Sequence, residues 1–192
     1  MNNSLLSRLA IKNRSYRRFY QEFTIERDSL LQFVELARLS PSAANLQPLR
    51  YFLSNDAITN EKIFQQLRWA GYLKEWDGPS PGERPSAYIV IMADTNIGIP
   101  GCDHGFAAQS ILLGAVEKNL GGCIVANIQK ETLKEQLNIS DKLDVLLVVA
   151  LGKPKEEVVL EPMDKSGSVK YWRSENEIHH VPKRSLEEII LN

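Results

Sequence analysis

The sequence has few of the features that mark several large classes of protein. Its two cysteines, Cys102 and Cys123, form no C-x-x-C pair, so neither a disulfide framework nor a cysteine-rich zinc site is indicated. The longest uninterrupted aliphatic run, Val145 to Leu151, is far shorter than the ~18 residues that suggest a membrane span. The opening stretch MNNSLLSRLA lacks the sustained apolar segment of a secretory signal. We therefore expect a cytoplasmic protein with no membrane partner.

An excess of one charge and the common nucleotide-binding motifs are also missing. The 23 Lys and Arg residues nearly balance 24 Asp and Glu residues, and the net charge of -1 gives the whole chain no attraction to nucleic acid. Neither G-x-G-x-x-G nor G-x-x-x-x-G-K-[ST] occurs, so a Rossmann site and a P-loop lack support. Cys102, Asp103 and His104 are adjacent, and adjacent ligands rarely converge on one metal ion. We expect no metal site and no nucleic-acid partner.

The residues that are present predict a globular chain of mixed helices and strands. With 192 residues, of which 43% are hydrophobic and 24% charged, we expect a single domain over 1–192 with a real core. Runs rich in aromatic and β-branched residues predict strands at 50–54, 87–94 and 144–152. Helical spacing of apolar residues predicts a helix over 27–39, which Pro41 ends.

A second, longer helix is predicted over 103–122. Asp103 is a plausible N-cap, and the pair Gly121-Gly122 is a plausible C-terminal stop. Apolar residues surround most of this helix, which predicts burial on most sides. After Gly152 the chain is polar and irregular, then both aromatic and charged. Such a tail cannot form its own core, so we expect it to wrap against this subunit or another.

Three separated segments combine basic and small polar residues. They are NRSYRRF (13–19), PSAANLQP (41–48) and VPKRSLEE (181–188). Arginine and lysine donors of this kind match a phosphate, and arginine adds bidentate geometry. Taken alone, each basic segment is ordinary surface charge, and PSAANLQP is a turn, because proline, serine and asparagine favour turns.

The order of these motifs resembles the nitroreductase-like family of FMN-dependent oxidoreductases. RSYRRF, PSAANLQP and PKRSLEEI correspond to the basic opening, the P-S-x-x-N-x-Q-P segment and the basic tail of that family. DHGFAAQSILLGAVEKNLGGCIV looks like its long central helix and the segment that follows. The resemblance covers nearly the whole chain. It implies an α+β, nitroreductase-like three-layer fold, with a central and mainly antiparallel sheet flanked by helices, in an intertwined homodimer.

The resemblance also implies roles for the basic residues. Arg14 and Ser15 fall where family members bind the FMN phosphate and ribityl chain, and Arg17 falls at the pyrimidine edge of the flavin. Lys183 and Arg184 match the C-terminal phosphate-binding pair. Because flavin carries the redox chemistry, the protein needs donors and positive charge around the ring rather than a catalytic dyad. We expect Arg17 to tune the flavin.

Two further segments are implied to form walls of the flavin site. Pro41, Ser42 and Asn45 match the segment that reaches FMN from the other subunit of the dimer. Ala126 and Asn127, within a residue or two, match the segment whose backbone N–H groups face flavin N5 and O4.

The substrate pocket is less well marked. One set of aromatic residues lies in segments that look specific to a subfamily. These are Trp69, Tyr72, Trp76, Tyr171 and Trp172. They form either an acceptor pocket or the aromatic packing of a subunit boundary. Two positions depart from the family pattern: Asn13 replaces an arginine found in many members, and Leu49 replaces a tryptophan.

The function implied by the resemblance is an NAD(P)H-dependent FMN oxidoreductase. It takes hydride from NADH or NADPH and reduces a small electrophile, such as a nitroaromatic, quinone or enone, by a ping-pong mechanism. Two alternatives stay open. One is a specialised flavin reaction of the same family, such as dehalogenation, dehydrogenation or flavin cleavage, and the other is a non-catalytic flavin-binding protein.

Overall fold

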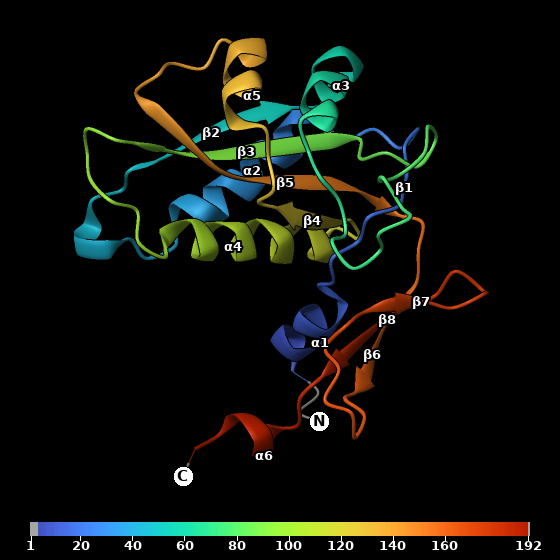
Figure 1. Ribbon diagram of the computed structural model, residues 1–192. Helices are drawn as coiled ribbons and strands as arrows, with labels where there is room; N and C mark the ends of the chain where they lie inside the picture. Colours follow the sequence, from blue (N-terminus) through green and yellow to red (C-terminus); the bar gives the residue numbers. More distant parts are fainter. Residues whose placement is uncertain (1–3, 192) are drawn as a thin grey trace.

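A computed structural model describes residues 4–191 (Figure 1). The helices are α1 (Leu5–Lys12), α2 (Arg27–Arg38), the 3-10 turn η1 (Ala43–Asn45), α3 (Ala57–Gln65), α4 (Asp103–Glu117), α5 (Lys130–Leu137) and α6 (Leu186–Ile189). The strands are β1 (Phe19–Tyr20), β2 (Leu49–Ser54), β3 (Ala87–Asp94), β4 (Gly121–Val125), β5 (Leu143–Pro154), β6 (Val158–Pro162), β7 (Trp172–Arg173) and β8 (His179–Lys183). Among the described residues no helix combines the length and apolarity needed to cross a membrane.

The central sheet holds five antiparallel strands built around β5. β5 pairs with β1, β3 and β4, and β3 pairs in turn with β2. From Val145 to Leu151, the middle of β5 is almost entirely buried, as its continuous apolar run predicts. The predicted strand over 87–94 matches β3 at both ends.

Helices cover both faces of this sheet and produce three layers. α2 and α4 pack on one face around Phe33, Ile111 and Ile89, all of which are buried. On the other face, α3 and α5 enclose a second apolar cluster that includes Ile63 and Leu133. Figure 1 shows α3 and α5 above the sheet and α4 below it. The α+β three-layer fold predicted from the sequence is therefore confirmed.

Both ends of α4 differ from the sequence-based prediction. Cys102 occupies the N-cap position, while the Asp103 carboxylate accepts hydrogen bonds from the Ser42 hydroxyl (2.6 Å) and the Ala43 N–H (3.0 Å). The helix ends at Glu117, and the two glycines after it open strand β4. The N-cap and stop-signal predictions were wrong, because Asp103 serves a neighbouring turn and the glycines serve the sheet.

The C-terminal tail, residues 155–191, forms a small unit beside α1 (Figure 1). β8 pairs in parallel with β6 and antiparallel with β7, and the four-residue α6 follows. The tail does contact its own subunit, as predicted. It does so mainly through charged and aromatic side chains, which belong to the candidate site.

Candidate functional site

The N-terminal basic segment, residues 13–18, runs against strand β4. Ser15 forms a parallel bridge with Gly122, and the Tyr16 N–H donates to the Gly122 carbonyl at 3.0 Å. A Cβ atom on Gly121 would lie 2.5 Å from the Tyr16 ring, and one on Gly122 would lie 2.5 Å from the Ala150 carbonyl oxygen. The glycine pair therefore lets the basic segment and β5 approach β4 closely.

Arg14 keeps one donor without a protein partner. Its Nη2 donates to the Ala10 carbonyl at 2.6 Å, while its buried Nε has no hydrogen-bond partner among residues 4–191. Burial lowers the pKa of Arg14, although a guanidinium stays charged at any physiological pH. A charged, buried N–H without an acceptor suits an anionic oxygen of a bound group.

Arg17 is held from three sides. Its Nη1 donates to the Ser15 carbonyl and to His179 Nε2, both at 3.2 Å, and its guanidinium carbon lies 4.9 Å from the centre of the Tyr171 ring. Burial, with help from the charges of Arg17 and Arg173, lowers the pKa of His179 to about 4. His179 is therefore neutral near pH 7 and accepts the Arg17 hydrogen bond.

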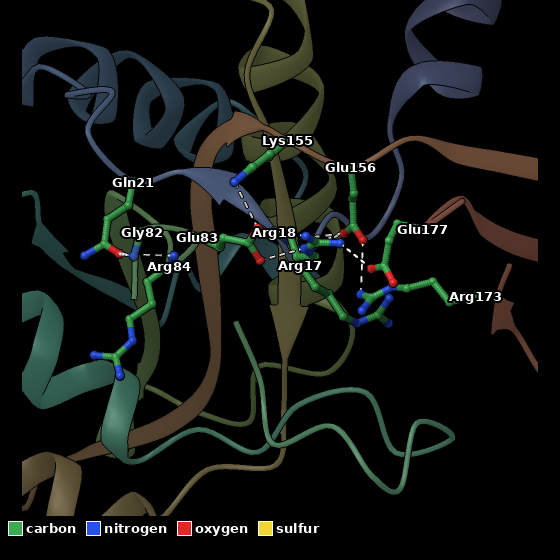
Figure 2. Close-up of polar contacts among 10 residues, drawn as sticks. All are labelled: Arg17, Arg18, Gln21, Gly82, Glu83, Arg84, Lys155, Glu156, Arg173 and Glu177. Carbon is green, nitrogen blue, oxygen red and sulfur yellow. Dashed lines mark hydrogen bonds and ion pairs between the residues drawn. The ribbon is translucent and has the colours of Figure 1, made fainter. Parts of the chain in front are cut away.

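A carboxylate from the tail secures the same segment (Figure 2). The Glu156 side chain is 1% exposed; it accepts the backbone N–H groups of Arg17 and Arg18 and a hydrogen bond from Arg173 Nη2 at 3.2 Å. Arg18 also bridges Glu83, at 2.6 and 2.7 Å, and Glu177, at 2.5 Å. This network ties the basic segment to the tail.

Glu83 is the second carboxylate of that network, and it binds both Arg18 and Lys155. Hydrogen bonds from Arg18, and then from Lys155, lower the pKa of Glu83 to about 2. The carboxylate therefore stays ionised across the physiological range. Glu83 lies in the long loop between α3 and β3, so the loop, the basic segment and the tail meet at one place (Figure 2).

The PSAANLQP segment forms the predicted turn at the far end of α4. Ala44, Asn45 and Gln47 have φ values of 48°, 55° and 53°, and the bonds of Ser42 and Ala43 to Asp103 hold this shape. Pro41 and Asn45 are exposed. α4 is about 22 Å long at 1.5 Å per residue, and it separates this turn from the glycines of β4 (Figure 1). One chain therefore does not bring Asn45 to Arg14.

Ala126 and Asn127 lie directly after β4 and are exposed. The Asn127 carbonyl accepts the Arg68 N–H at 3.0 Å, which joins this segment to the loop that follows α3. Both residues continue the strand against which Ser15 lies, but they follow its last residue, Val125, whereas Ser15 bridges Gly122 near its start.

Lys183 and Arg184 stand apart from the basic segment. β8 starts at His179, beside Arg17, and reaches Lys183 after a rise of roughly 13 Å at 3.3 Å per residue. Both basic side chains are exposed, and Arg184 pairs with Glu188 at 3.5 Å. The strand therefore carries Lys183 and Arg184 away from its Arg17 end.

The aromatic candidates fall into different surroundings. The Tyr171 ring lies beside Arg17 and 5.0 Å from the Tyr72 ring, and Trp76 lies under Arg173 with its ring 4.7 Å from the guanidinium carbon. Trp69 is buried against Phe64, at 5.9 Å between ring centroids. Trp172 stacks on His180 at 5.0 Å and is 46% exposed.

The sequence analysis missed Glu156, His179 and Arg173. All three lie in the tail, and Glu156 and His179 contact Arg17, which lies 139 and 162 positions earlier. Glu156 carries no motif in the sequence. The signal that could have singled out His179 is its place in the aromatic and charged tail.

The sequence was compared with the profiles of known protein families. The profile of the nitroreductase family matches residues 11–77 and 82–153, which include the basic segment, the PSAANLQP turn and strand β4. The chain belongs to the nitroreductase family. The tail, with Glu156, His179, Lys183 and Arg184, lies beyond the matched residues.

Individual relatives are distant. A protein of Archaeoglobus fulgidus, provisionally named NADH dehydrogenase/NAD(P)H nitroreductase, is 27% identical over 151 residues, covering 73% of this chain and 80% of its own length. An FMN-dependent nitroreductase from Clostridium difficile R20291 has a TM-score of 0.64 at 24% identity, covering 78% and 87%. A nitroreductase family protein from Streptococcus pneumoniae TIGR4 has a TM-score of 0.70 at 17% identity, covering 97% and 99%.

Proposed function

We propose that this protein is an FMN-dependent oxidoreductase that takes hydride from NADH or NADPH and reduces a small electrophile such as a nitroaromatic, quinone or enone. The observation that carries the proposal is the basic segment on β4, where Arg14 keeps a buried donor free and Arg17 is fixed by four contacts. The family match and the NAD(P)H nitroreductase names of distant relatives support the same class of reaction.

The residues of the basic segment suit a flavin mononucleotide. Arg14 and Ser15 would hold the phosphate and ribityl chain, because the free Nε of Arg14 needs an anionic acceptor. Arg17 would sit at the pyrimidine edge, where a fixed positive charge favours the reduced and more negative state of the ring. Bound FMN would supply the hydride chemistry. The chain would supply positive charge and hydrogen-bond donors that hold the flavin in position.

The remaining site residues imply a second copy of the chain. Pro41, Ser42 and Asn45 lie at the far end of α4, so we assign them to the flavin site of the partner subunit in a homodimer. Exposed apolar residues agree with such an interface: Leu5, Leu6, Leu39 and Ile99 are 59%, 64%, 64% and 86% exposed. An interface between subunits would remove such side chains from water.

The aromatic residues next to Arg17 supply an acceptor surface. We assign contact with the acceptor to Tyr72 and Tyr171, because the Tyr171 ring lies beside the guanidinium that would reach the flavin edge and the Tyr72 ring packs on it. Trp76 would border that surface through Arg173, whereas buried Trp69 and Trp172, which stacks on His180, would support it.

The first test is a visible absorption spectrum of the purified protein after incubation with FMN, followed by anaerobic addition of NADH and then NADPH. We expect flavin peaks that bleach with at least one donor and return when an acceptor is added. A folded protein that takes up no FMN would overturn the proposal. FMN retained without turnover by either donor would leave a non-catalytic flavin-binding protein.

An FMN titration tests the role of Arg14. Arg14→Ala removes a charge-assisted donor, so FMN affinity should fall by about 10- to 100-fold, the range that a loss of 1.5–3 kcal/mol predicts. Arg27→Ala, which changes an exposed arginine at the start of α2, is the matched control. Equal affinity in the two variants would contradict the phosphate assignment.

A further inference from the structure

The PSAANLQP turn concentrates left-handed backbone in a short run. Among residues 4–191, seven residues other than glycine have a positive φ, and three of them, Ala44, Asn45 and Gln47, fall within four consecutive positions. A Cβ atom disfavours this conformation, so it persists only where surrounding contacts enforce it, and such strain gathers at functional sites. All three residues are exposed, so their conformation does not serve the core.

The contacts that enforce this shape come from the first residue of α4, which lies beside the turn (Figure 1). Asp103 is 4% exposed, and its Oδ1 accepts the Ala43 N–H at 3.0 Å while its Oδ2 accepts the Ser42 hydroxyl at 2.6 Å. Because that hydroxyl gives its proton to Asp103, its oxygen is left to accept the Gln47 N–H, at 2.9 Å. Both ends of the left-handed run are therefore tied to one buried carboxylate.

The side chains of Gln47 and Asn45 continue this chain of hydrogen bonds. Gln47 Nε2 donates to the backbone carbonyl and to Oδ1 of Asn45, at 3.2 Å in each case. A backbone carbonyl can only accept, so the end of the Gln47 amide that meets it is the NH2 group. The end of the Asn45 amide that meets the same NH2 group is then its oxygen. These roles fix the orientation of both amides.

The opposite end of the Asn45 amide is left free. Its Nδ2 has no hydrogen-bond partner among residues 4–191, and Asn45 is exposed. An NH2 group can only donate, so it binds an acceptor such as a carbonyl oxygen or an unprotonated ring nitrogen. The pyrimidine part of a flavin carries acceptors of both kinds. The turn is thus shaped to present one donor outward.

We propose that Asp103 and Gln47 are positioning residues of the flavin site. They hold the strained turn so that Asn45 presents its NH2 group as a donor to an acceptor atom of the FMN bound by the partner subunit. This role rests on the proposed function and deepens it, because both residues act through Asn45 without touching the flavin. Asp103 acts across the 60 positions that separate it from Ala43.

The first measurement uses the full-length protein without FMN. Asp103→Asn replaces one acceptor oxygen by an NH2 group, so the side chain can no longer accept from both donors of the turn. Amide hydrogen exchange of Ala43 and Gln47, followed by NMR, should accelerate by about 10-fold. Asp141→Asn, at an exposed aspartate before β5, should leave it unchanged. Equal exchange in the two variants would overturn the role of Asp103, whether or not FMN binds.

The second measurement is an FMN titration of the same variants and of Asn45→Asp. Asn45→Asp keeps an oxygen for Gln47 and tolerates a left-handed φ, but it removes the free donor, so FMN affinity should fall by about 10-fold. Asp103→Asn should lose affinity several-fold, and the double variant should bind as Asn45→Asp does, because both changes remove the same contact. Losses that multiply in the double variant would show that Asp103 serves folding rather than Asn45, which would overturn the proposal.

Gln47→Glu is the second variant if Asp103→Asn fails to fold. The change removes only the exposed donor that orients Asn45, so FMN affinity should fall several-fold while the free energy of unfolding stays the same. Gln32→Glu, at an exposed glutamine of α2, is the control of equal charge. Equal affinity in these two variants would overturn this inference alone. An unmodified protein that takes up no FMN would instead overturn the proposed function, and the flavin contact of Asn45 with it.

Discussion

The three-layer body and the C-terminal tail are stabilised in different ways. In the body, the middle of β3 from Tyr88 to Ile91 is 0% exposed, and so are Ile111 on α4 and Leu133 on α5. In the tail, the buried side chains are the polar ones, Glu156 and His179, whereas Leu186 and Ile190 are 67% and 54% exposed. Apolar burial therefore holds the body together, and charge and hydrogen bonding attach the tail to it.

This contrast bears on the candidate site, because the polar contacts of the tail fall on the basic segment. Glu156 holds the backbone of Arg17 and Arg18, and His179 holds the Arg17 guanidinium. Any change that releases the tail should therefore also release Arg17. The body can remain folded in that case, since the buried residues of both core clusters lie outside the tail and, of the tail, Tyr171 alone packs against one of them among the described residues.

The largest difference is expected between apolar truncations in the two regions. Ile111→Ala leaves a cavity in a fully buried layer, so it should lower the free energy of unfolding by about 2–5 kcal/mol. Leu186→Ala, on the exposed α6, should change it by less than about 0.5 kcal/mol in a monomer. Urea unfolding followed by circular dichroism measures both. A large loss in Leu186→Ala would show that α6 is covered, as in a dimer.

Acid should weaken the tail through His179. This histidine has a pKa of about 4 when folded and an ordinary value near 6.5 when unfolded, so the unfolded chain binds the extra proton between those values. Its contribution to stability is complete above about pH 6.5 and is lost as pH falls toward 4. By linkage, about 2–3 kcal/mol should be lost between pH 7 and pH 4.5.

His179→Gln removes that titration and keeps an acceptor for Arg17, so its unfolding free energy should depend less on pH over this window. His180→Gln is the matched control from the adjacent position, and it should follow the unmodified protein. Measurements stay above pH 4.5 because Glu83, with a pKa of about 2, loses its own contribution only as pH falls below that point. Equal pH dependence in the two variants would exclude His179 as the group responsible.

Glu156→Gln should release the tail without unfolding the body. The change weakens charge-assisted hydrogen bonds from Arg17, Arg18 and Arg173, at a cost of about 1.5–3 kcal/mol. Faster amide hydrogen exchange in β6, β7 and β8, with unchanged exchange in β3, would show local release. Glu157→Gln, an exposed neighbour, is the control. Equal acceleration in the body would contradict the separation of the two regions.

Much of the body could be predicted from the sequence because its signals are local. Period and composition located α2, β3 and β5 within a few residues, since apolar patterns report which face is buried. Prediction failed at Asp103 and Gly121, where residues with strong local preferences serve distant partners instead. Asp103 binds the turn at Ser42, and Gly121 makes room for Tyr16.

The residues of the candidate site also differ in how well the sequence predicts them. Arg14, Ser15 and Arg17 could be selected because a short motif holds all three, and the structure does bring that motif to β4. Glu156 and His179 could not be selected, because their role depends on how the tail folds back. The long helix after Asp103 was predicted, but its place between the PSAANLQP turn and β4, which separates the two within one chain, was not.

The smallest effect on stability is expected at the end of the tail. A substitution there separates the role of the tail in folding from its role in binding FMN. Arg184→Gln breaks only an exposed pair with Glu188, so the free energy of unfolding should change by less than about 0.5 kcal/mol. FMN affinity should nevertheless fall by about 10-fold, because the resemblance assigns Arg184 to the phosphate. Arg68→Gln, another exposed arginine, is the control for an FMN titration. An FMN affinity unchanged by Arg184→Gln would confine phosphate binding to the basic segment on the body and leave the tail with the sole task of positioning Arg17.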